Sequence, residues 1–293
     1  MIRAETLVRQ GEDFIVDDAT ETRYQLASVS KQFTAAAALL LVEDGTLVLD
    51  DPVRRWIDDC PRKWRDVTLH HLLTHTSGLG HWDDYPMIDL ALRVEPSELL
   101  RTFDSVPLLY PPGEGWSYSS PAYVLLAHVV ERAADTPYRV FMADRIFDHL
   151  GLTDTFAGAP GARPNLAVGH DGEGRPLPTW DLDVVCMGAG DVWSTARDVL
   201  AWLDALQSGH LLSEPYRTLM LTERTRTGKG PDESGYGYGV FVGELNGRRW
   251  WHHSGDNAGF KAFAGNIPEL GRRIVVLSNT EATEASALEP LLA

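Results

Sequence analysis

The feature that most constrains this 293-residue chain is a lysine at the start of a helix without a polar face. Lys31 comes just before the run Ala35–Val42, which is apolar on every side, and a helix of that kind is buried. The chain otherwise uses arginine as its cation, with 22 arginines against four lysines. Burial and the positive end of a helix both favour a neutral amine. The sequence therefore predicts an enclosed helix whose first turn carries a base.

Ser28 lies three residues before Lys31, on the same face of the expected helix. A hydroxyl beside a deprotonated amine is an activated nucleophile. Serine before a helix is also a common N-cap, and the pattern S-x-x-K arises by chance in a chain of this length. Taken alone, the pair leaves both interpretations open.

Composition narrows the classes of partner. A chain that is 44% hydrophobic can bury a large core, as one big domain or two interleaved ones. Its 26 Lys and Arg against 42 Asp and Glu give a net charge of −16, which argues against nucleic acids and anionic membranes as partners. Cys60 and Cys186 show no metal-ligand spacing, and Cys186 in its apolar run is expected to be a buried, inert thiol.

The start of the chain has no apolar segment of the kind found in signal peptides. The longest apolar run, Ala35–Val42, is far too short to span a membrane. We therefore expect a cytoplasmic protein.

The order of predicted elements indicates a sheet built from both ends of the chain. Residues 5–17 predict a β-hairpin around Gly11, and residues 157–180 predict a Gly- and Pro-rich loop. Thr195 and Asp198 fit a capping box that opens a helix. A short helix is expected to close the chain. The other predicted helices are Leu69–Leu73, Ser97–Phe103, Pro121–Ala134 and Tyr138–Leu150, and the predicted strands are Tyr238–Gly243, Trp250–His253, Phe260–Gly265 and Arg273–Ser278.

This order predicts an α+β fold, an antiparallel sheet flanked by helices with an inserted all-helical subdomain. The sheet lobe would comprise residues 1–50 and 181–293, and the mainly helical lobe residues 51–180. A cleft between two such lobes is where a site is expected.

Two further clusters carry possible chemistry. Tyr118 follows a turn-rich segment, so its phenol can be held in a cleft, where a nearby cation that lowered its pKa would let it accept or pass a proton. His253 begins the sequence His-Ser-Gly on a predicted strand, where Gly255 would let a ligand approach the backbone and the amide of Asp256 could donate to an oxyanion. Each cluster alone also fits an ordinary loop or strand end.

The three clusters begin at Ser28, Tyr118 and His253. Taken in their order along the chain, they resemble the triple signature of the penicillin-recognising serine hydrolases. The similarity is to the branch of class C β-lactamases, D,D-peptidases and family VIII esterases. It extends over nearly the whole chain. Other segments that resemble the family are Val67–Leu79, Pro112–Tyr118, Leu150–Leu152, Ser194–Asp198 and Gly259–Phe260.

The resemblance implies a β-lactamase/transpeptidase-like fold and a role for each matching residue. Ser28 would attack a carbonyl and form an acyl-enzyme, Lys31 would take or relay its proton, and Tyr118 would cooperate as base and protonate the leaving group. The backbone amides of Ser28 and Asp256 would hold the oxyanion. No metal or other cofactor is implied. The residues expected to bind substrate are Ser120, His253, Ser254 and Gly255.

The chain departs from the family pattern in three ways, of which the first two bear on the substrate. Ser120 stands where the family usually has asparagine, so it offers a hydroxyl instead of an amide. His253 replaces a lysine that would pair with a substrate carboxylate. A histidine at this position resembles the esterase, aminopeptidase and D,D-peptidase members of the family. The chain also begins almost at its first strand, so the closing helix is expected to cover one face of the sheet.

These features predict a serine hydrolase for a small ester, peptide or β-lactam, with a carboxylesterase favoured slightly over a D-amino-acid peptidase and β-lactamase activity expected to be weak. One alternative is a non-catalytic binding module on the same fold. Another is a metal-dependent hydrolase, since His71 and His75 are four residues apart with His81 and Asp83 downstream, although the glutamate base of zincins is absent. Oligomeric state is left open. Aromatic residues expected either around the cleft or in the core are Trp116, Tyr236, Tyr238, Trp250 and Trp251.

Overall fold

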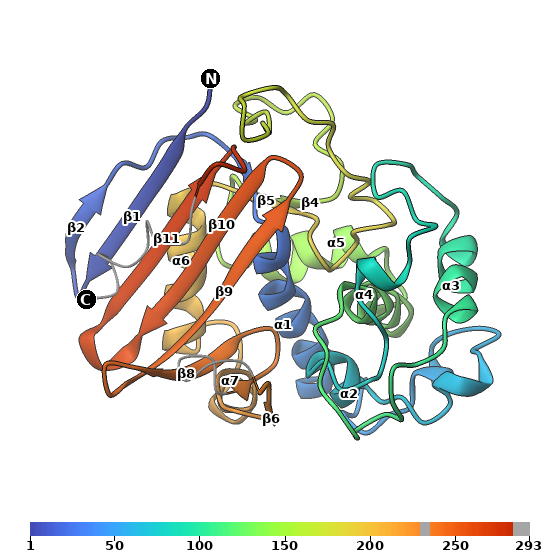
Figure 1. Cartoon of the computed structure of the whole chain (residues 1–293). Helices are drawn as coiled ribbons and strands as arrows, with labels where there is room; N and C mark the ends of the chain where they lie inside the picture. Colours follow the sequence, from blue (N-terminus) through green and yellow to red (C-terminus); the bar gives the residue numbers. More distant parts are fainter. Residues whose placement is uncertain (229–234, 284–293) are drawn as a thin grey trace.

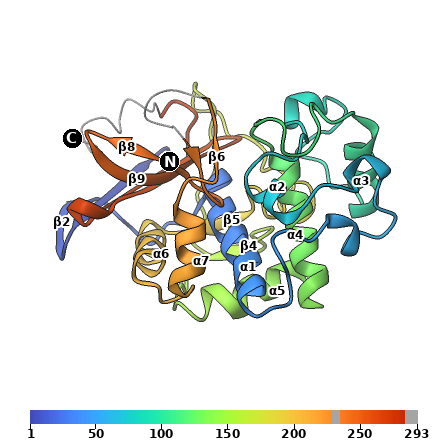
Figure 2. The ribbon, with the colours of Figure 1, turned by 90° about the horizontal axis from the view of Figure 1, so that it is seen from below.

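A long antiparallel sheet and a group of helices lie side by side, with helix α1 (Ser30–Glu43) between them (Figures 1 and 2). This computed structural model describes residues 1–228 and 235–283. Every residue of α1 from Ser30 to Leu41 is buried, as its apolar run predicts. The predicted α+β architecture is confirmed. The division into lobes 1–50 with 181–293 and 51–180 stays a prediction.

The large sheet joins the two ends of the chain. Its strand order is β2-β1-β11-β10-β9-β8-β7-β6, and the first strand pairs antiparallel with the last from Ala4↔Ser278 to Gln10↔Arg272. The predicted hairpin around Gly11 is formed by β1 and β2. The strands are β1 (Ala4–Gln10), β2 (Asp13–Asp17), β6 (Thr225–Arg226), β7 (Gly235–Tyr236), β8 (Phe241–Leu245), β9 (Arg248–Asn257), β10 (Phe260–Ile267) and β11 (Arg272–Ser278).

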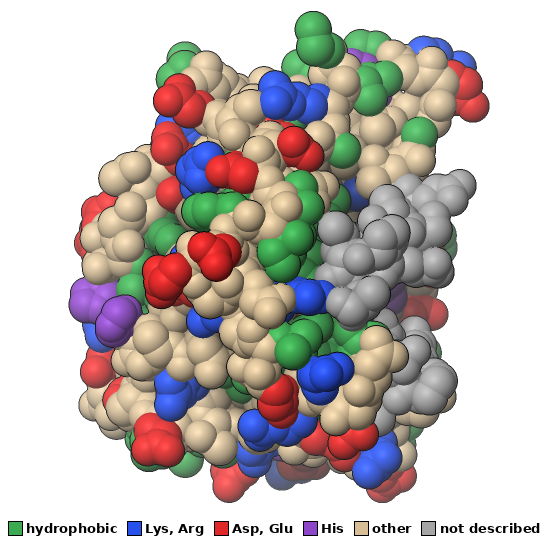
Figure 3. All heavy atoms as spheres, turned by 90° about the vertical axis from the view of Figure 1, so that its left-hand side faces the viewer, with side chains coloured by type: hydrophobic (Ala, Val, Ile, Leu, Met, Phe, Trp, Pro, Cys, Tyr) green, Lys and Arg blue, Asp and Glu red, His purple; other side chains and the backbone are tan. Residues whose placement is uncertain are grey.

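Side chains on the two faces of this sheet enter different clusters. On β11, Val275 and Leu277 join the main core around α1, whereas Ile274 and Val276 pack with Trp250 on the outer face. Figure 3 shows acidic and basic side chains mixed with apolar patches on the side of the molecule that faces left in Figure 1. The closing helix expected to cover one face of the sheet falls outside the described residues.

The helices agree with the predicted ranges at most positions. Helix α2 has the predicted bounds. Within residues 1–228 and 235–283, no helix is long and apolar enough to cross a bilayer. Helix α7 was not expected, and the helix predicted to reach Leu150 changes at Ala143 into a π-helical turn. The remaining helices are α2 (Leu69–Leu73), α3 (Pro96–Ser105), α4 (Ser120–Ala134), α5 (Tyr138–Met142), α6 (Ala196–Ser208) and α7 (Glu214–Leu221).

A second sheet of three short strands lies beside the start of α1. Its order is β3-β5-β4, with β3 at Tyr24–Gln25, β4 at Phe156–Ala157 and β5 at Val192–Ser194. The amide of Val192 donates to the Ser30 hydroxyl at 3.0 Å, which ties this sheet to the first turn of α1.

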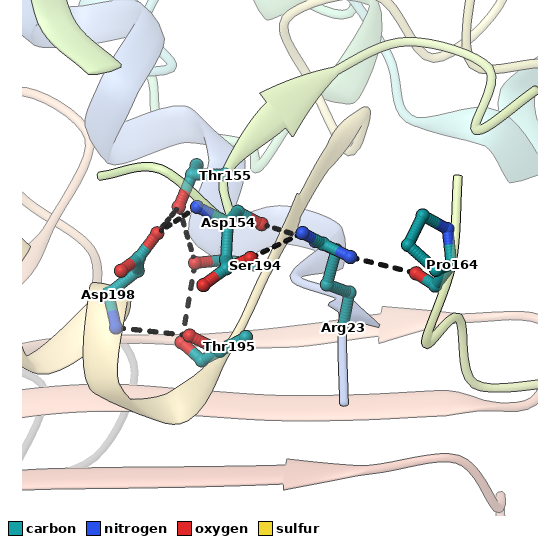
Figure 4. A network of polar contacts seen from close by, with 7 residues as sticks. All are labelled: Arg23, Asp154, Thr155, Pro164, Ser194, Thr195 and Asp198. Carbon is teal, nitrogen blue, oxygen red and sulfur yellow. Dashed lines mark hydrogen bonds and ion pairs between the residues drawn. The ribbon is translucent and has the colours of Figure 1, made fainter. Parts of the chain in front are cut away.

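The start of α6 is held by the network in Figure 4. Thr195 caps the helix by accepting the amide of Asp198 at 3.2 Å, as predicted. The reciprocal half of the predicted capping box is wrong. The Asp198 carboxylate instead accepts the amide of Asp154 at 2.9 Å and the hydroxyl of Thr155 at 2.8 Å. The Arg23 guanidinium also binds Asp154, so the network joins three segments that are distant in sequence.

Candidate active site

Ser28 lies in a tight 3-10 turn, Ala27–Val29, directly before α1. It is partly exposed, whereas its two neighbours are fully buried. Ala27 has a φ of +46°, a left-handed conformation that is strained for a residue with a side chain and recurs at functional sites. The turn therefore presents the Ser28 hydroxyl at the surface of an otherwise closed core.

Gly255 on β9 is what allows this turn to pack against the sheet. A Cβ at this position would lie 2.2 Å from the carbonyl oxygen of Leu26. We expected Gly255 to let a ligand approach the strand; instead, the segment that carries Ser28 makes the close approach. The glycine thus sets the distance between the serine and β9.

The amine of Lys31 is buried and has three oxygen neighbours. Nζ lies 2.7 Å from the carbonyl oxygen of Ala189, 3.1 Å from the Ser120 hydroxyl and 3.0 Å from the Ser28 hydroxyl. A neutral amine has two hydrogens and one lone pair. Ala189 and Ser120 can accept the hydrogens, which leaves the lone pair for the hydrogen of Ser28. Burial lowers the pKa of Lys31 to about 7, so this neutral form is present near neutrality.

Asp191 is a titratable neighbour that the sequence did not reveal. Its side chain is fully buried, and neither carboxylate oxygen forms a hydrogen bond of standard geometry with a described residue. Burial raises the pKa of Asp191 to about 7. Its charge opposes the effect of burial on Lys31, because a nearby anion stabilises the ammonium form. The proton equilibria of the two residues are therefore coupled.

Tyr118 faces the lysine from the helical side of the molecule. Its ring centre lies 5.0 Å from Nζ of Lys31. We expected a cation to lower the phenol pKa, but the main effect is burial, which raises it, while the Ser28 hydroxyl opposes the rise. The phenol oxygen makes no hydrogen bond of standard geometry with the described residues. A protonated phenol at this position fits a proton donor better than a resting base.

The imidazole of His253, the first residue of the third cluster, is neutral. Nδ1 of His253 lies 2.6 Å from the carbonyl oxygen of Ser254, which can only accept, so Nδ1 carries the hydrogen. Nε2 then accepts from the hydroxyl of Tyr236 at 3.1 Å. Burial lowers the pKa of His253 to about 3, so the imidazole is neutral at ordinary pH. His253 therefore does not replace the cation that the family usually has at this position.

The structure does not bring the side chains of Ser254 and Asp256 to the serine. Both are exposed, and their antiparallel partners on β10, Phe263 and Lys261, place them on the outer face of the sheet. Asp256 forms an ion pair with Lys261 at 2.5 Å. The predicted substrate role of the Ser254 side chain therefore has no support in the geometry.

The backbone of β9 does border the site. Strand β8 pairs with β9 only as far as Phe241↔His252, which leaves the edge from His253 onward free to face the Ser28 turn. Ser28, Ser120 and Asp256 line one cavity of about 70 Å³. The placement of Ser28 and Asp256 at one cavity is compatible with the predicted oxyanion hole of their backbone amides. Two larger cavities, of about 650 and 680 Å³, are lined by other residues.

The histidines considered as metal ligands have other partners. Nδ1 of His71 accepts the amide of Thr68 at 3.2 Å in a capping box, and His75 lies beyond the end of α2. Nδ1 of His75 accepts the amide of Ser119 at 3.1 Å. Among residues 1–228 and 235–283, no group of three or more His, Cys, Asp or Glu side chains could hold a metal ion.

Comparison with known proteins agrees with this geometry. Esterase EstB from Burkholderia gladioli is 33% identical over 266 residues, which cover 75% of this chain and 65% of EstB. The match covers 31% and 54% of the next two curated relatives, so the chain spans about a third to two thirds of the length of these three proteins. The structure resembles the octameric penicillin-binding protein homologue from Pyrococcus abyssi, with a TM-score of 0.85 and 26% identity over 99% of this chain and 73% of that one.

A second solved structure adds an amide-cleaving relative. The D-stereospecific amidohydrolase from Streptomyces sp. has a TM-score of 0.82 and 25% identity over 97% of this chain and 91% of its own. The protein family described as Beta-lactamase matches residues 17–292. The order of the three clusters, the position of Ser28 before a buried helix and this match all agree: the chain belongs to the Beta-lactamase family.

Proposed function

We propose that this protein is a serine hydrolase that cleaves small, uncharged esters through an acyl-enzyme. The observation that carries the proposal is the partly exposed hydroxyl of Ser28, 3.0 Å from the fully buried amine of Lys31. A serine next to a neutral amine is activated for attack on a carbonyl carbon.

The reaction proceeds in two stages. Lys31 accepts the Ser28 proton as Oγ bonds to the carbonyl carbon, and the amides of Ser28 and Asp256 stabilise the oxyanion. The alkoxide leaves as the carbonyl re-forms, and it takes a proton from Tyr118, which is restored from Lys31. In the second stage, Lys31 accepts a proton from water as the water oxygen bonds to the acyl carbon. The acid leaves as the bond from that carbon to Oγ breaks, and Oγ takes the proton from Lys31, which regenerates Ser28.

Charge around the serine favours an ester over a charged peptide or penicillin. His253 is neutral, and the Asp256 carboxylate lies on the outer face in its ion pair with Lys261. The site therefore offers no unpaired cation for a substrate carboxylate and no unpaired anion for a substrate amine among these groups. An uncharged acyl group loses less hydration on entering such a site.

The cavity beside Ser28 favours a short acyl chain. Its volume of about 70 Å³ is far below the several hundred Å³ typical of sites for drug-sized ligands. Its aromatic walls, Trp82 and Trp180, would contact an apolar acyl group. EstB, named as an esterase, supports this class of substrate.

The amide-cleaving relative supports a second candidate, a D-amino-acid amidase or peptidase. A panel of p-nitrophenyl esters from acetyl to octanoyl, D-alanyl p-nitroanilide and nitrocefin separates these activities. We expect the largest kcat/KM for the acetyl or butyryl ester and weak nitrocefin cleavage. A kcat/KM that is larger for D-alanyl p-nitroanilide than for every ester would replace the ester proposal with the amidase.

Labelling distinguishes the enzyme from a binding module. A fluorophosphonate probe should add its mass to the peptide containing Ser28, and Ser28→Ala should abolish the adduct. No adduct and no turnover with any substrate would favour the non-catalytic alternative. Turnover that is lost in a chelator and restored by zinc would support the metal-dependent alternative.

A further inference from the structure

The loop that carries Tyr118 is held by a second loop, residues 75–81. The amide of Ser117 donates to the carbonyl oxygen of His75 at 3.1 Å, and the Ser119 hydroxyl donates to the carbonyl oxygen of Gly80 at 2.8 Å. Nearby, the amide of Gly113 donates to the carbonyl oxygen of Thr76 at 2.8 Å. The position of Tyr118 thus depends on contacts to a segment about 40 residues earlier.

Two histidines bind the two amides that follow Tyr118. Nδ1 of His75 accepts the amide of Ser119 at 3.1 Å, and Nδ1 of His81 accepts the amide of Ser120 at 3.2 Å. Both bonds require an unprotonated Nδ1. Consecutive amides on one loop are therefore fixed by two imidazoles from another.

His75 also packs directly on the tyrosine. Its ring centre lies 4.5 Å from that of Tyr118 and 4.7 Å from that of Tyr236. The side chain is completely buried, and burial lowers its pKa well below the usual value, so it remains a neutral acceptor. The backbone φ of His75 is +61°, in the left-handed region that few residues other than glycine adopt.

His81 is connected to Lys31 through Ser120. It lines the same cavity as Ser28 and Ser120. The residue whose amide it accepts, Ser120, places its hydroxyl 3.1 Å from Nζ of Lys31. Fixing this amide therefore fixes a neighbour of the base as well as the loop of the tyrosine.

We propose that His75 and His81 are positioning residues that hold Tyr118 and Ser120 in place for proton transfer to the leaving group. This inference rests on the proposed hydrolase function. It assigns to both histidines a role through a hydrogen-bond acceptor at Nδ1, not through a charge or a metal.

The test compares substitutions that keep and remove this acceptor. Asparagine places an oxygen close to the position of Nδ1, whereas leucine fills more of the imidazole volume without an acceptor. We expect His81→Leu to lower kcat for p-nitrophenyl acetate by about tenfold or more with little change in KM, and His81→Asn to retain most activity. The same order is expected for His75→Leu and His75→Asn, although asparagine leaves the larger cavity.

A double-mutant cycle separates positioning from general damage. If His75 acts through Tyr118, His75→Leu should cost much less kcat in a Tyr118→Phe background than in the wild type. If His81 acts through Tyr118 and Ser120, His81→Leu should cost much less in a background that carries both Tyr118→Phe and Ser120→Ala. Equal losses in the wild type and in these backgrounds, or equal kcat for the leucine and asparagine variants, would overturn the inference. Thermal melts establish that each variant is folded at the assay temperature.

Hydrogen exchange provides a readout that does not need turnover. We expect the amides of Ser119 and Ser120 to exchange faster in the leucine variants than in the asparagine variants. Unchanged exchange would contradict the positioning role even in an active enzyme. Faster exchange in a protein that neither turns over esters nor labels at Ser28 would leave the loop contacts in place and reject the hydrolase.

Discussion

The two sides of the candidate site are built in different ways. On one side, Ser28 and Lys31 belong to a buried turn and helix that pack against β9 with backbone in contact with backbone. On the other side, Tyr118 lies on a loop whose amides bind side chains of a second loop. In the proposed mechanism, burial on the first side sets the pKa of the base, and hydrogen bonds on the second side set the position of the proton donor. Substitutions on the two sides should therefore fail in different ways.

The largest effect is expected at the nucleophile. Ser28→Ala should lower kcat by about 10⁴-fold or more and leave the melting temperature nearly unchanged, because the hydroxyl is partly exposed and carries the chemistry. Ester turnover and thermal unfolding measure the two quantities. Ser97→Ala on the exposed face of α3 is the matched control and should change neither. Retained turnover in Ser28→Ala would remove the nucleophile assignment.

The base should come next. Lys31→Met keeps the buried chain length but removes the amine, so acylation should slow by about 10³-fold while the helix stays packed. In the wild type, kcat/KM should fall as pH decreases through about 7, because the amine becomes protonated and loses its lone pair. A normal acylation rate in Lys31→Met would show that another group is the base, and Lys63→Met serves as the control.

A substitution at the backbone contact should affect both stability and activity. Gly255→Ala places a Cβ 2.2 Å from the carbonyl oxygen of Leu26, so the Ser28 turn must move. We expect a loss of about 1–3 kcal/mol in the free energy of unfolding and about 10²-fold in kcat/KM. Gly172→Ala, which meets no atom within 4 Å, should change neither quantity. Normal values in Gly255→Ala, from urea unfolding and ester kinetics, would mean that this contact does not place the serine.

The smallest expected effect is a shift in pH dependence. Asp191→Asn removes a buried anion that raises the pKa of Lys31, so the acidic limb of kcat/KM should move to lower pH. Asp183→Asn removes a carboxylate that pairs with Arg139 and should leave the limb unchanged. A limb that stays in place, or moves to higher pH, in Asp191→Asn would exclude electrostatic coupling between the two buried groups.

The two sides of the candidate site differ in how far the sequence could predict them. Ser28 and Lys31 are three residues apart beside an apolar run, so local spacing and helix periodicity predicted that they lie together at a buried helix. Their expected catalytic roles came from the resemblance of all three clusters to the family. The contacts of His75 and His81 join segments about 40 residues apart, and no local pattern specifies which amide a histidine will accept. The same limit applies to Asp191, whose burial depends on the packing of distant segments. Helix α7 was missed because the surrounding region favours strands.

The pairing of the first strand with the last has a consequence for biosynthesis. Strand β1 is synthesised long before its partner β11, which ends at Ser278, so the large sheet cannot close until β11 has left the ribosome. Until then the apolar stretch after Lys31 lacks its cover, which is the condition under which nascent chains aggregate or recruit chaperones. The proposed hydrolytic activity would therefore arise only after β11 has been made.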